Sequence, residues 1–219
     1  MKTLVIDVGG SHVKLLATGR RTPLKLPSGP DLTPAAMVAS VRDATVDWHY
    51  DRVSIGYPGP VANNAPSNEP ANLGAGWAGF DFAAALGCAV RVVNDAAMQA
   101  LGSYDGGTML FLGLGTGLGS TLVRDGMLVP LELAHLPYRH DKTYEQYLGE
   151  AAMERLGKKK WRRHVEIVTA LFLAAFNADY VVLGGGNTRL LAELPPGARR
   201  GSNANAFSGG YRLWSEPRA

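Results

Sequence analysis

Cysteine is nearly absent from this chain, with one residue, Cys88, among 219. A single thiol excludes an internal disulfide and provides no thiolate cluster for zinc, so a reducing cytoplasm is the simplest compartment. Long apolar runs are also missing. The longest, from Ile167 to Asn177, is roughly half the length that crosses a bilayer. Met1-Lys2 leads directly into a patterned strand with no signal peptide before it. We therefore expect a cytoplasmic protein with no membrane partner.

Charge of one sign is in short supply as well. The chain has 22 Lys and Arg against 19 Asp and Glu, and its net charge of +3 is modest for a nucleic-acid-binding protein. Five cations nevertheless crowd together, at Lys158, Lys159, Lys160, Arg162 and Arg163. Such a cluster is typical of a solvated helix face, or alternatively of a track for a polyanionic substrate. Because only Trp161 is interleaved with these cations, we expect no nucleic-acid partner.

Glycine, in contrast, is abundant, with 27 residues, and it concentrates in two turns about a hundred residues apart. Each stretch, Asp7 to Lys14 and Gly113 to Ser120, follows an apolar run and is typical of a strand, a tight turn and a second strand. Glycine lets backbone N–H groups approach an anion with no Cβ in the way. Two such turns predict a duplicated unit that clamps one polyphosphate from both sides.

The remaining pattern mixes strands and helices, which indicates an α/β protein. We predict an N-terminal lobe over residues 1–105, a C-terminal lobe over 106–200, and a tail, 201–219, that packs back on the body. In the first lobe, Thr33 as N-cap and Pro34 at the first helical position predict a helix through about His49. In the second lobe, helices are expected over residues 144–156 and 161–176.

Asn94-Asp95 is the most suggestive polar pair, because it follows a short apolar strand and precedes a helix. A carboxylate at the carboxyl end of a strand lies where open α/β sheets bind their ligands. Asn and Asp are also good helix N-caps. Both interpretations can hold together, with one residue capping the helix and the other facing a ligand.

These features occur in order with further motifs, Tyr57-Pro-Gly-Pro-Val, Glu132-Leu-Ala-His135 and Gly184-Gly-Gly. The ordered set resembles the ROK family of sugar kinases and repressors, and within it most the polyphosphate/ATP glucokinases. The resemblance covers about residue 2 to residue 192. It implies an actin-like ATPase fold, in which two similar α/β lobes surround a central cleft. It also implies an enzyme that transfers a terminal phosphoryl group from ATP or inorganic polyphosphate to a hexose hydroxyl, with glucose as the first expectation.

Other functions stay open beside this one. The acceptor could be an amino sugar or mannose, or the chain could be a non-catalytic sugar-binding protein with the same fold. A DNA-binding repressor is not expected, because only Met1 to Thr3 precede the first glycine-rich strand.

The resemblance also implies a role for particular residues. Asp95 would be the catalytic base, and Asp7 would position Mg²⁺, through water. Sugar hydroxyls would be held by Gly59, Asn72, Asn94, Glu132, His135 and Glu145. Phosphates or a nucleotide would be bound by Gly9, Gly10, Ser11, Lys14, Gly115, Thr116, Gly117, Gly184, Gly185 and Gly186. No zinc is expected, because the cysteine-rich motif that many members carry after this histidine is missing. A homodimer is typical of the family.

Several of these assignments have a plain structural alternative. Glu145 could be an exposed carboxylate in the first turn of a helix, and Lys14 could point to solvent from its strand. Gly184 to Gly186 could be an ordinary turn after a strand. The chain is also shorter than most members after His135 and at its C-terminus, which leaves the adenosine pocket, and hence the choice between ATP and polyphosphate, open.

Overall fold

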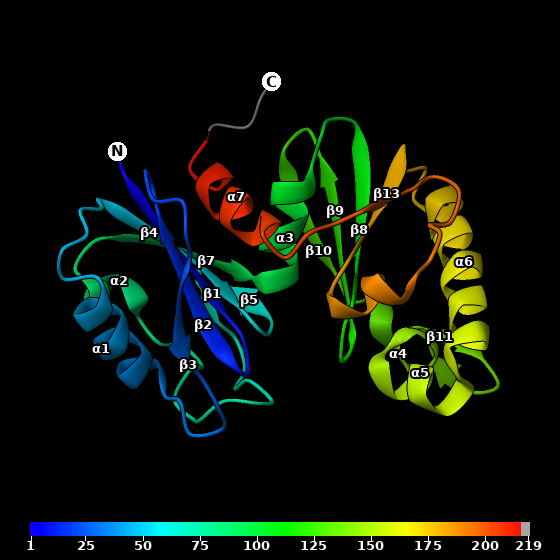
Figure 1. The fold of residues 1–219 in the computed structure, drawn as a ribbon, viewed down its shortest axis with the longest axis horizontal. Helices are drawn as coiled ribbons and strands as arrows, with labels where there is room; N and C mark the ends of the chain where they lie inside the picture. The colour runs from blue at the N-terminus through cyan, green and yellow to red at the C-terminus, as the bar shows by residue number, and fades with distance from the viewer. Residues whose placement is uncertain (216–219) are drawn as a thin grey trace. The chain divides into compact units, whose positions relative to one another are not determined.

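The computed structural model describes residues 1–215 and divides into two compact units. Residues 1–98 and 206–215 form the first unit, and residues 99–205 form the second (Figure 1). This division falls inside the helix that begins at Asp95, earlier than the predicted boundary near residue 105. Much of the predicted tail belongs to the first unit, and its last residues, 216–219, lie outside the described residues.

The two units share one sheet plan, a three-stranded antiparallel meander extended by two parallel strands. The first sheet has the order β3 (Leu24–Pro27), β2 (His12–Ala17), β1 (Thr3–Val8), β4 (Arg52–Tyr57), β7 (Ala89–Asn94). The second has the order β10 (Met127–Leu131), β9 (Leu118–Arg124), β8 (Thr108–Leu114), β13 (Tyr180–Gly184), β14 (Ala198–Arg200). The predicted duplication is therefore present in the topology.

Both faces of the first sheet are covered, which is why β1 is a continuous apolar run with no exposed position. On one face Leu4, Ile6 and Val8 pack against α1 (Pro34–Ala44). On the other, Val5 packs with Met98 of α3 (Asp95–Ser103) and with α7 (Asn205–Arg212). Figure 1 shows α1 and α7 on opposite sides of this sheet.

The first helix of this unit, α1, starts where the sequence predicts but ends earlier. The Thr33 hydroxyl accepts a hydrogen bond from the Ala36 amide at 3.2 Å, which confirms the predicted cap of α1. The predicted end near His49 is wrong, because α1 ends at Ala44. The hydroxyl of Thr45 bonds back to the Val41 carbonyl at 2.7 Å and closes the last turn. The Asp81 carboxylate caps α2 (Phe82–Leu86) in the same manner as Thr33.

The segment between β4 and α2 contains a small hairpin of β5 (Val61–Ala62) and β6 (Ala65–Pro66). Its turn residues Asn63 and Asn64 have φ of 50° and 63°, the left-handed conformation that two-residue hairpin turns need. The Asn64 amide bonds to the backbone of Val90 and Val92. It therefore ties the hairpin to the edge strand β7.

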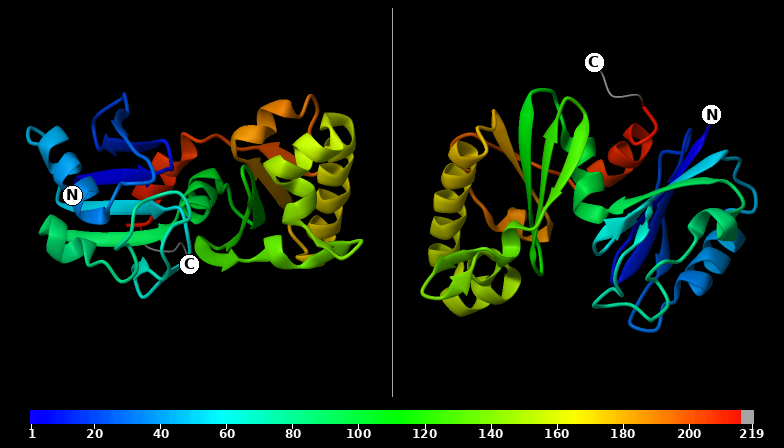
Figure 2. Two further views of the ribbon diagram at one scale, coloured as in Figure 1. Left: turned by 90° about the horizontal axis from the view of Figure 1, so that it is seen from below. Right: turned by 180° about the vertical axis from the view of Figure 1, so that it is seen from behind.

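One face of the second sheet is covered by the longest helix, α6 (Lys158–Ala175), which runs beside it in Figures 1 and 2. Trp161, Val168 and Phe172 of α6 pack in one core cluster with Leu110 and Leu112 of β8. None of the helices within residues 1–215 combines the length and the apolarity that a membrane span requires. Short elements complete this unit: β11 (Pro137–Arg139), β12 (Lys142–Thr143) and the 3₁₀ turns η1 (Leu133–His135) and η2 (Gly186–Leu190).

The single helix predicted over residues 144–156 is wrong, because the structure has two, α4 (Glu145–Leu148) and α5 (Glu150–Leu156). Between them Gly149 is extended, with φ −69° and ψ 171°. A Cβ at this position would lie 2.8 Å from the Thr116 carbonyl oxygen. Contact of the chain with the glycine turn after β8 thus interrupts the helix, and only glycine permits it.

The end of the described chain is fastened to the first unit by a buried relay. Ser54, fully buried in β4, donates its hydroxyl to the Gly210 carbonyl at 2.6 Å and accepts the Trp214 indole N–H at 2.8 Å. The guanidinium groups of Arg52 and Arg91 lie 4.8 Å and 4.7 Å from the ring of Trp214. This relay, together with the packing of Phe207, holds α7 against the sheet.

Ser54→Ala should lower the free energy of unfolding by about 1–3 kcal/mol, because it leaves the Gly210 carbonyl and the Trp214 N–H buried without their partner. Chemical denaturation of the whole chain measures the change. The control is Ser208→Ala, at an exposed position of α7, which should change stability by less than about 0.5 kcal/mol. Equal effects of the two substitutions would mean that the Ser54 hydrogen bonds do not stabilise the fold.

Candidate active site

The carboxyl ends of three parallel strands bring the predicted residues of the first unit to one edge of its sheet. β1, β4 and β7 run in the same direction and are adjacent. Their ends lead into the Gly9–Ser11 turn, into Gly59 and into Asn94-Asp95. This edge is where parallel sheets bind ligands, so the sequence prediction for Asp95 agrees with its position.

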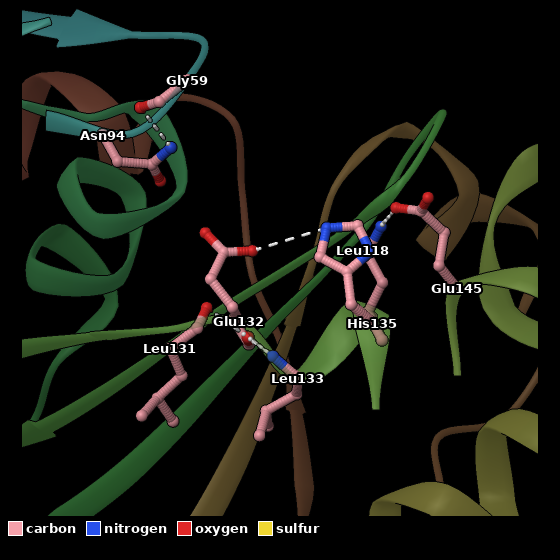
Figure 3. Close-up of polar contacts among 9 residues, drawn as sticks. Gly59, Asn94, Leu118, Leu131, Glu132, Leu133, His135 and Glu145 are labelled. Atoms are coloured by element: carbon pink, nitrogen blue, oxygen red, sulfur yellow. Dashed lines mark hydrogen bonds and ion pairs between the residues drawn. The ribbon is translucent and has the colours of Figure 1, made fainter. Parts of the chain in front are cut away.

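Asn94 and Asp95 divide the two roles that the sequence left open. The Asn94 side-chain oxygen accepts the amides of Ala96 and Ala97, at 2.9 and 3.2 Å, and so caps α3. Its amide nitrogen donates to the Gly59 carbonyl at 3.1 Å, which fixes the loop after β4 (Figure 3). The Asp95 carboxylate accepts the neighbouring Ala96 amide at 2.7 Å. Asn94 therefore caps the helix, and Asp95 is the first residue of the helix; its contact with a ligand stays a prediction.

The surroundings of Asp95 make its carboxyl group harder to ionise than that of an ordinary aspartate. Burial raises the pKa of this carboxyl to about 6, and the negative charge of Asp7 contributes in the same direction. The Ala96 amide and the Lys14 ammonium act in the opposite sense and lower the pKa. Asp95 is therefore a stronger base than an ordinary aspartate and is still ionised for the most part at neutral pH.

Asp7 and Lys14 face each other across the first hairpin, because they are register partners in β1 and β2. The Lys14 ammonium donates to the buried Asp7 carboxylate at 3.0 Å. Lys14 is therefore paired with Asp7, and its contact with a phosphate stays a prediction. Its charge neutralises Asp7 while it remains one-third exposed.

The first glycine turn is open on its outer side. The Gly9 amide bonds to the His12 carbonyl at 3.0 Å and closes the turn. Gly10 and Ser11 are exposed, and a Cβ at Gly10 would contact the Asn72 side chain at 3.5 Å. The structure therefore brings Asn72, predicted as a sugar ligand, next to the turn that is predicted to bind phosphate.

In the second unit, three groups form hydrogen bonds that support the second glycine turn. The Glu145 carboxylate accepts the Leu118 amide at 3.0 Å and fills the space beside Gly117 (Figure 3). The Glu150 amide and the Asn187 side chain both donate to the Gly115 carbonyl, each at 3.1 Å. Thr116, at the tip, is exposed. The alternative of Glu145 as a freely exposed carboxylate is wrong, because one of its oxygens supports this turn.

Glu132 and His135 form an open pair at η1. Their side chains are 76% and 73% exposed, and the Glu132 carboxylate lies 3.9 Å from the His135 ring nitrogen Nε2 (Figure 3). The backbone beneath is fixed by Ser120, whose hydroxyl donates to the Leu131 carbonyl and accepts the Leu133 amide. The pair is anchored at its base and free to bind a solute at its tips.

Gly184 and Gly185 are required by packing. A Cβ on Gly184 would run into the Phe111 ring, and one on Gly185, whose φ is 84°, would run into the Leu114 backbone. Gly186 has open space around it. Asn187, which the sequence analysis did not single out, joins this segment to the second glycine turn. Its signal was only its place directly after three glycines.

These two units and their matched glycine turns define the class of fold: the structure is an actin-like ATPase fold, as predicted. No family model matches the chain. Over 216 residues it is 28% identical to a polyphosphate glucokinase of Mycobacterium tuberculosis (strain CDC 1551 / Oshkosh), covering 87% of this chain and 80% of that protein.

Among solved structures, the inorganic polyphosphate/ATP-glucomannokinase of Arthrobacter sp. strain KM superposes with a TM-score of 0.77 at 22% identity, covering 98% of this chain and 99% of that one. A ROK family glucokinase of Streptomyces griseus, in complex with glucose and AMPPNP, gives a TM-score of 0.75 at 18% identity, covering 97% and 99%. The resemblance to ROK sugar kinases that the motifs predicted is confirmed.

The double role of Asn94 can be separated by substitution. Asn94→Ala removes the cap of α3 and should lower the free energy of unfolding by about 1 kcal/mol more than Asn94→Ser, which keeps a capping oxygen. Both variants lose the bond to Gly59, so that loss cancels in the comparison. Equal stability of the two variants in chemical denaturation would mean that Asn94 does not cap the helix.

Proposed function

We propose that this chain is a sugar kinase that transfers the terminal phosphoryl group of ATP or inorganic polyphosphate to a hexose hydroxyl, with glucose as the favoured acceptor and glucose 6-phosphate as product. The observation that carries the proposal is the position of Asp95 at the carboxyl edge of the first sheet, where burial and the negative charge of Asp7 raise its pKa. The names of the similar proteins, polyphosphate glucokinase and polyphosphate/ATP-glucomannokinase, support the same substrates.

Asp95 would act as the general base. Phosphoryl transfer passes through a loose transition state, in which the proton of the attacking hydroxyl leaves late. The carboxylate therefore contributes by orienting the hydroxyl as well as by accepting its proton. Because Asn94 caps α3, Asp95 is held at a fixed place where the first helical turn begins.

The other sugar contacts are proposals of the same kind. The Asn94 amide has a second hydrogen beside the one given to Gly59, and the Gly59 carbonyl has a second lone pair. Asn72 lies beside Gly10, and the exposed Glu132 and His135 would bind neighbouring hydroxyls. Glu145 would contribute the carboxylate oxygen that does not support Leu118.

The phosphates would be bound at the two glycine turns, Gly9 to Ser11 and Gly115 to Gly117, with Lys14 adding charge. The amides of Gly9 and Gly115 close their own turns by bonding to the carbonyls of His12 and Gly117, so the other amides of each turn would face the phosphates. Gly184 to Gly186 would lie against an adenosine when ATP is the donor. That role is compatible with the packing of Gly184 and Gly185, because Gly186 remains open.

Asp7 fits a magnesium ion in the way that kinases use one. Within residues 1–215 no group of three acidic, histidine or cysteine side chains could hold a metal by itself. Mg²⁺ is usually held by one or two carboxylates, while water and substrate phosphates complete its shell. Asp7, near the first glycine turn, provides one carboxylate, and the ion when bound would neutralise charge on the transferring phosphates. Mg²⁺, a cytoplasmic location and a homodimer stay predictions.

Mannose is the second acceptor to test, because the Arthrobacter structure is that of a glucomannokinase. An amino sugar as acceptor and a non-catalytic sugar-binding role stay alternatives to test.

Asp95→Asn should lower kcat by about 10²–10⁴-fold and change KM for the sugar little. In the wild type kcat/KM should fall about tenfold per pH unit below pH 6, since the carboxylate must be ionised to accept a proton and its pKa is raised from 3.8 to about 6. Steady-state kinetics with ATP and glucose measure both effects.

The matched control is Asp47→Asn, an exposed carboxylate of the same unit, which should leave rate and pH profile unchanged. A variant at position 95 that keeps near-normal kcat, or that keeps the acidic limb of the profile, would contradict the assignment of the base.

A further inference from the structure

A basic groove on the second unit is not used by any of the roles above. It is lined by Arg139 of β11 and by Lys160, Arg163, His164 and Ile167 of α6, and its volume is about 390 Å³. Three of these side chains carry positive charge and none carries negative charge. Arg139, Lys160 and Arg163 are all exposed. The sequence showed the cluster on α6 but gave no sign that Arg139 joins it from a different element.

The positive charge of the groove is uncompensated. Arg139, Lys160 and Arg163 form no ion pair with any carboxylate in the part of the chain that the structure describes. Lys158, Lys159 and Lys160 stand in the first turn of α6, where no acidic residue accompanies them. Cations are electrostatically unfavourable at that end of a helix. Fold stability therefore does not account for this charge, whereas binding of an anion would.

His164 is the one ring in the groove's lining, and it packs against two tyrosines. The Tyr138 hydroxyl lies 3.3 Å from His164 Nδ1, and the Tyr147 and His164 rings are 4.6 Å apart. Arg155 lies over the outer side of Tyr147, and Trp161 is fully buried. Burial and the charges of Arg139, Arg163 and Arg155 lower the pKa of His164, which shows how positive this region is. Nucleic-acid bases would find no exposed ring on which to stack.

We propose that this groove binds the distal part of an inorganic polyphosphate chain whose terminal phosphate is the phosphoryl donor. The proposal rests on the proposed function for the identity of the donor. Arg139 and Arg163 present guanidinium forks, and Lys160 an ammonium, to non-bridging phosphate oxygens. An inorganic polyanion matches a lining that has three cations and no carboxylate.

The groove is tied to the second glycine turn through hydrogen bonds within one unit. The buried Trp161 of α6 donates its indole N–H to the Leu148 carbonyl at the end of α4, at 2.8 Å. Two residues further on, the Glu150 amide donates to the Gly115 carbonyl of the turn at 3.1 Å. Cations on α6 and the phosphate-binding amides are thus parts of the same compact unit.

The test compares two pairs of charge substitutions on the same helix. Lys160→Gln with Arg163→Gln removes two cations that line the groove, whereas Lys158→Gln with Lys159→Gln removes two cations outside it. Calorimetric titration of the whole chain with long-chain polyphosphate, and with tripolyphosphate, measures binding without any need for turnover. KM for polyphosphate and for ATP is measured on the same three proteins, wild type included.

The groove pair should raise both Kd and KM for long-chain polyphosphate about tenfold, leave tripolyphosphate and ATP within a factor of about two, and make binding less sensitive to salt. The outer pair should change these values little. Equal losses in the two pairs, equal losses for tripolyphosphate, or tighter binding of single-stranded RNA than of polyphosphate would overturn the proposal.

The experiment separates the groove from the proposed function. If wild type phosphorylates glucose from polyphosphate and the groove pair behaves as wild type, the groove does not bind polyphosphate and the proposed function stands. If the chain phosphorylates no sugar from any donor yet binds long-chain polyphosphate through the groove, the proposed function fails and the binding site stands.

Discussion

The candidate active site depends on how the chain passes from β7 into α3, because this junction sets the positions of Asn94 and Asp95. Two adjacent polar residues occupy this junction, and the hydrogen bonds of Asn94 decide what Asp95 can do. Asn94 supplies the cap and holds Gly59, while the Asp95 carboxylate accepts the neighbouring Ala96 amide. Its burial next to Asp7 then raises its pKa and makes it a better base. At this edge of the first sheet, Asn94 therefore fixes the backbone and Asp95 provides the basic group.

In the second unit, close backbone contacts and two polar side chains fix the second glycine turn. Gly149 and Gly185 lie so close to the second glycine turn that a side chain at either would collide with its backbone. Glu145 and Asn187 add polar support from two elements. The turn is therefore held through the Gly115 carbonyl, which accepts two of these bonds, and through the Leu118 amide, which donates to Glu145.

Local chemistry made the sequence informative where a residue's partners lie close in the chain. Thr33 and Pro34 start α1 as expected, and the two glycine turns fall between the strands predicted for them. Long-range contacts could not be foreseen. The break at Gly149 needs Thr116, the helix after Asn205 needs the Ser54 relay, and the pairing of Lys14 with Asp7 needs the strand register. Asn187 escaped notice because its partner, Gly115, is 72 residues away in the sequence.

The most direct test is to identify the product. The whole chain is incubated with Mg²⁺ and each pairing of ATP or polyphosphate with glucose, mannose, glucosamine or N-acetylglucosamine, and phosphorus NMR follows the reaction. Glucose 6-phosphate should form from ATP, polyphosphate or both, and formation should be almost abolished by Asp95→Asn. Folded protein that binds glucose and forms no sugar phosphate from any pairing would contradict the account.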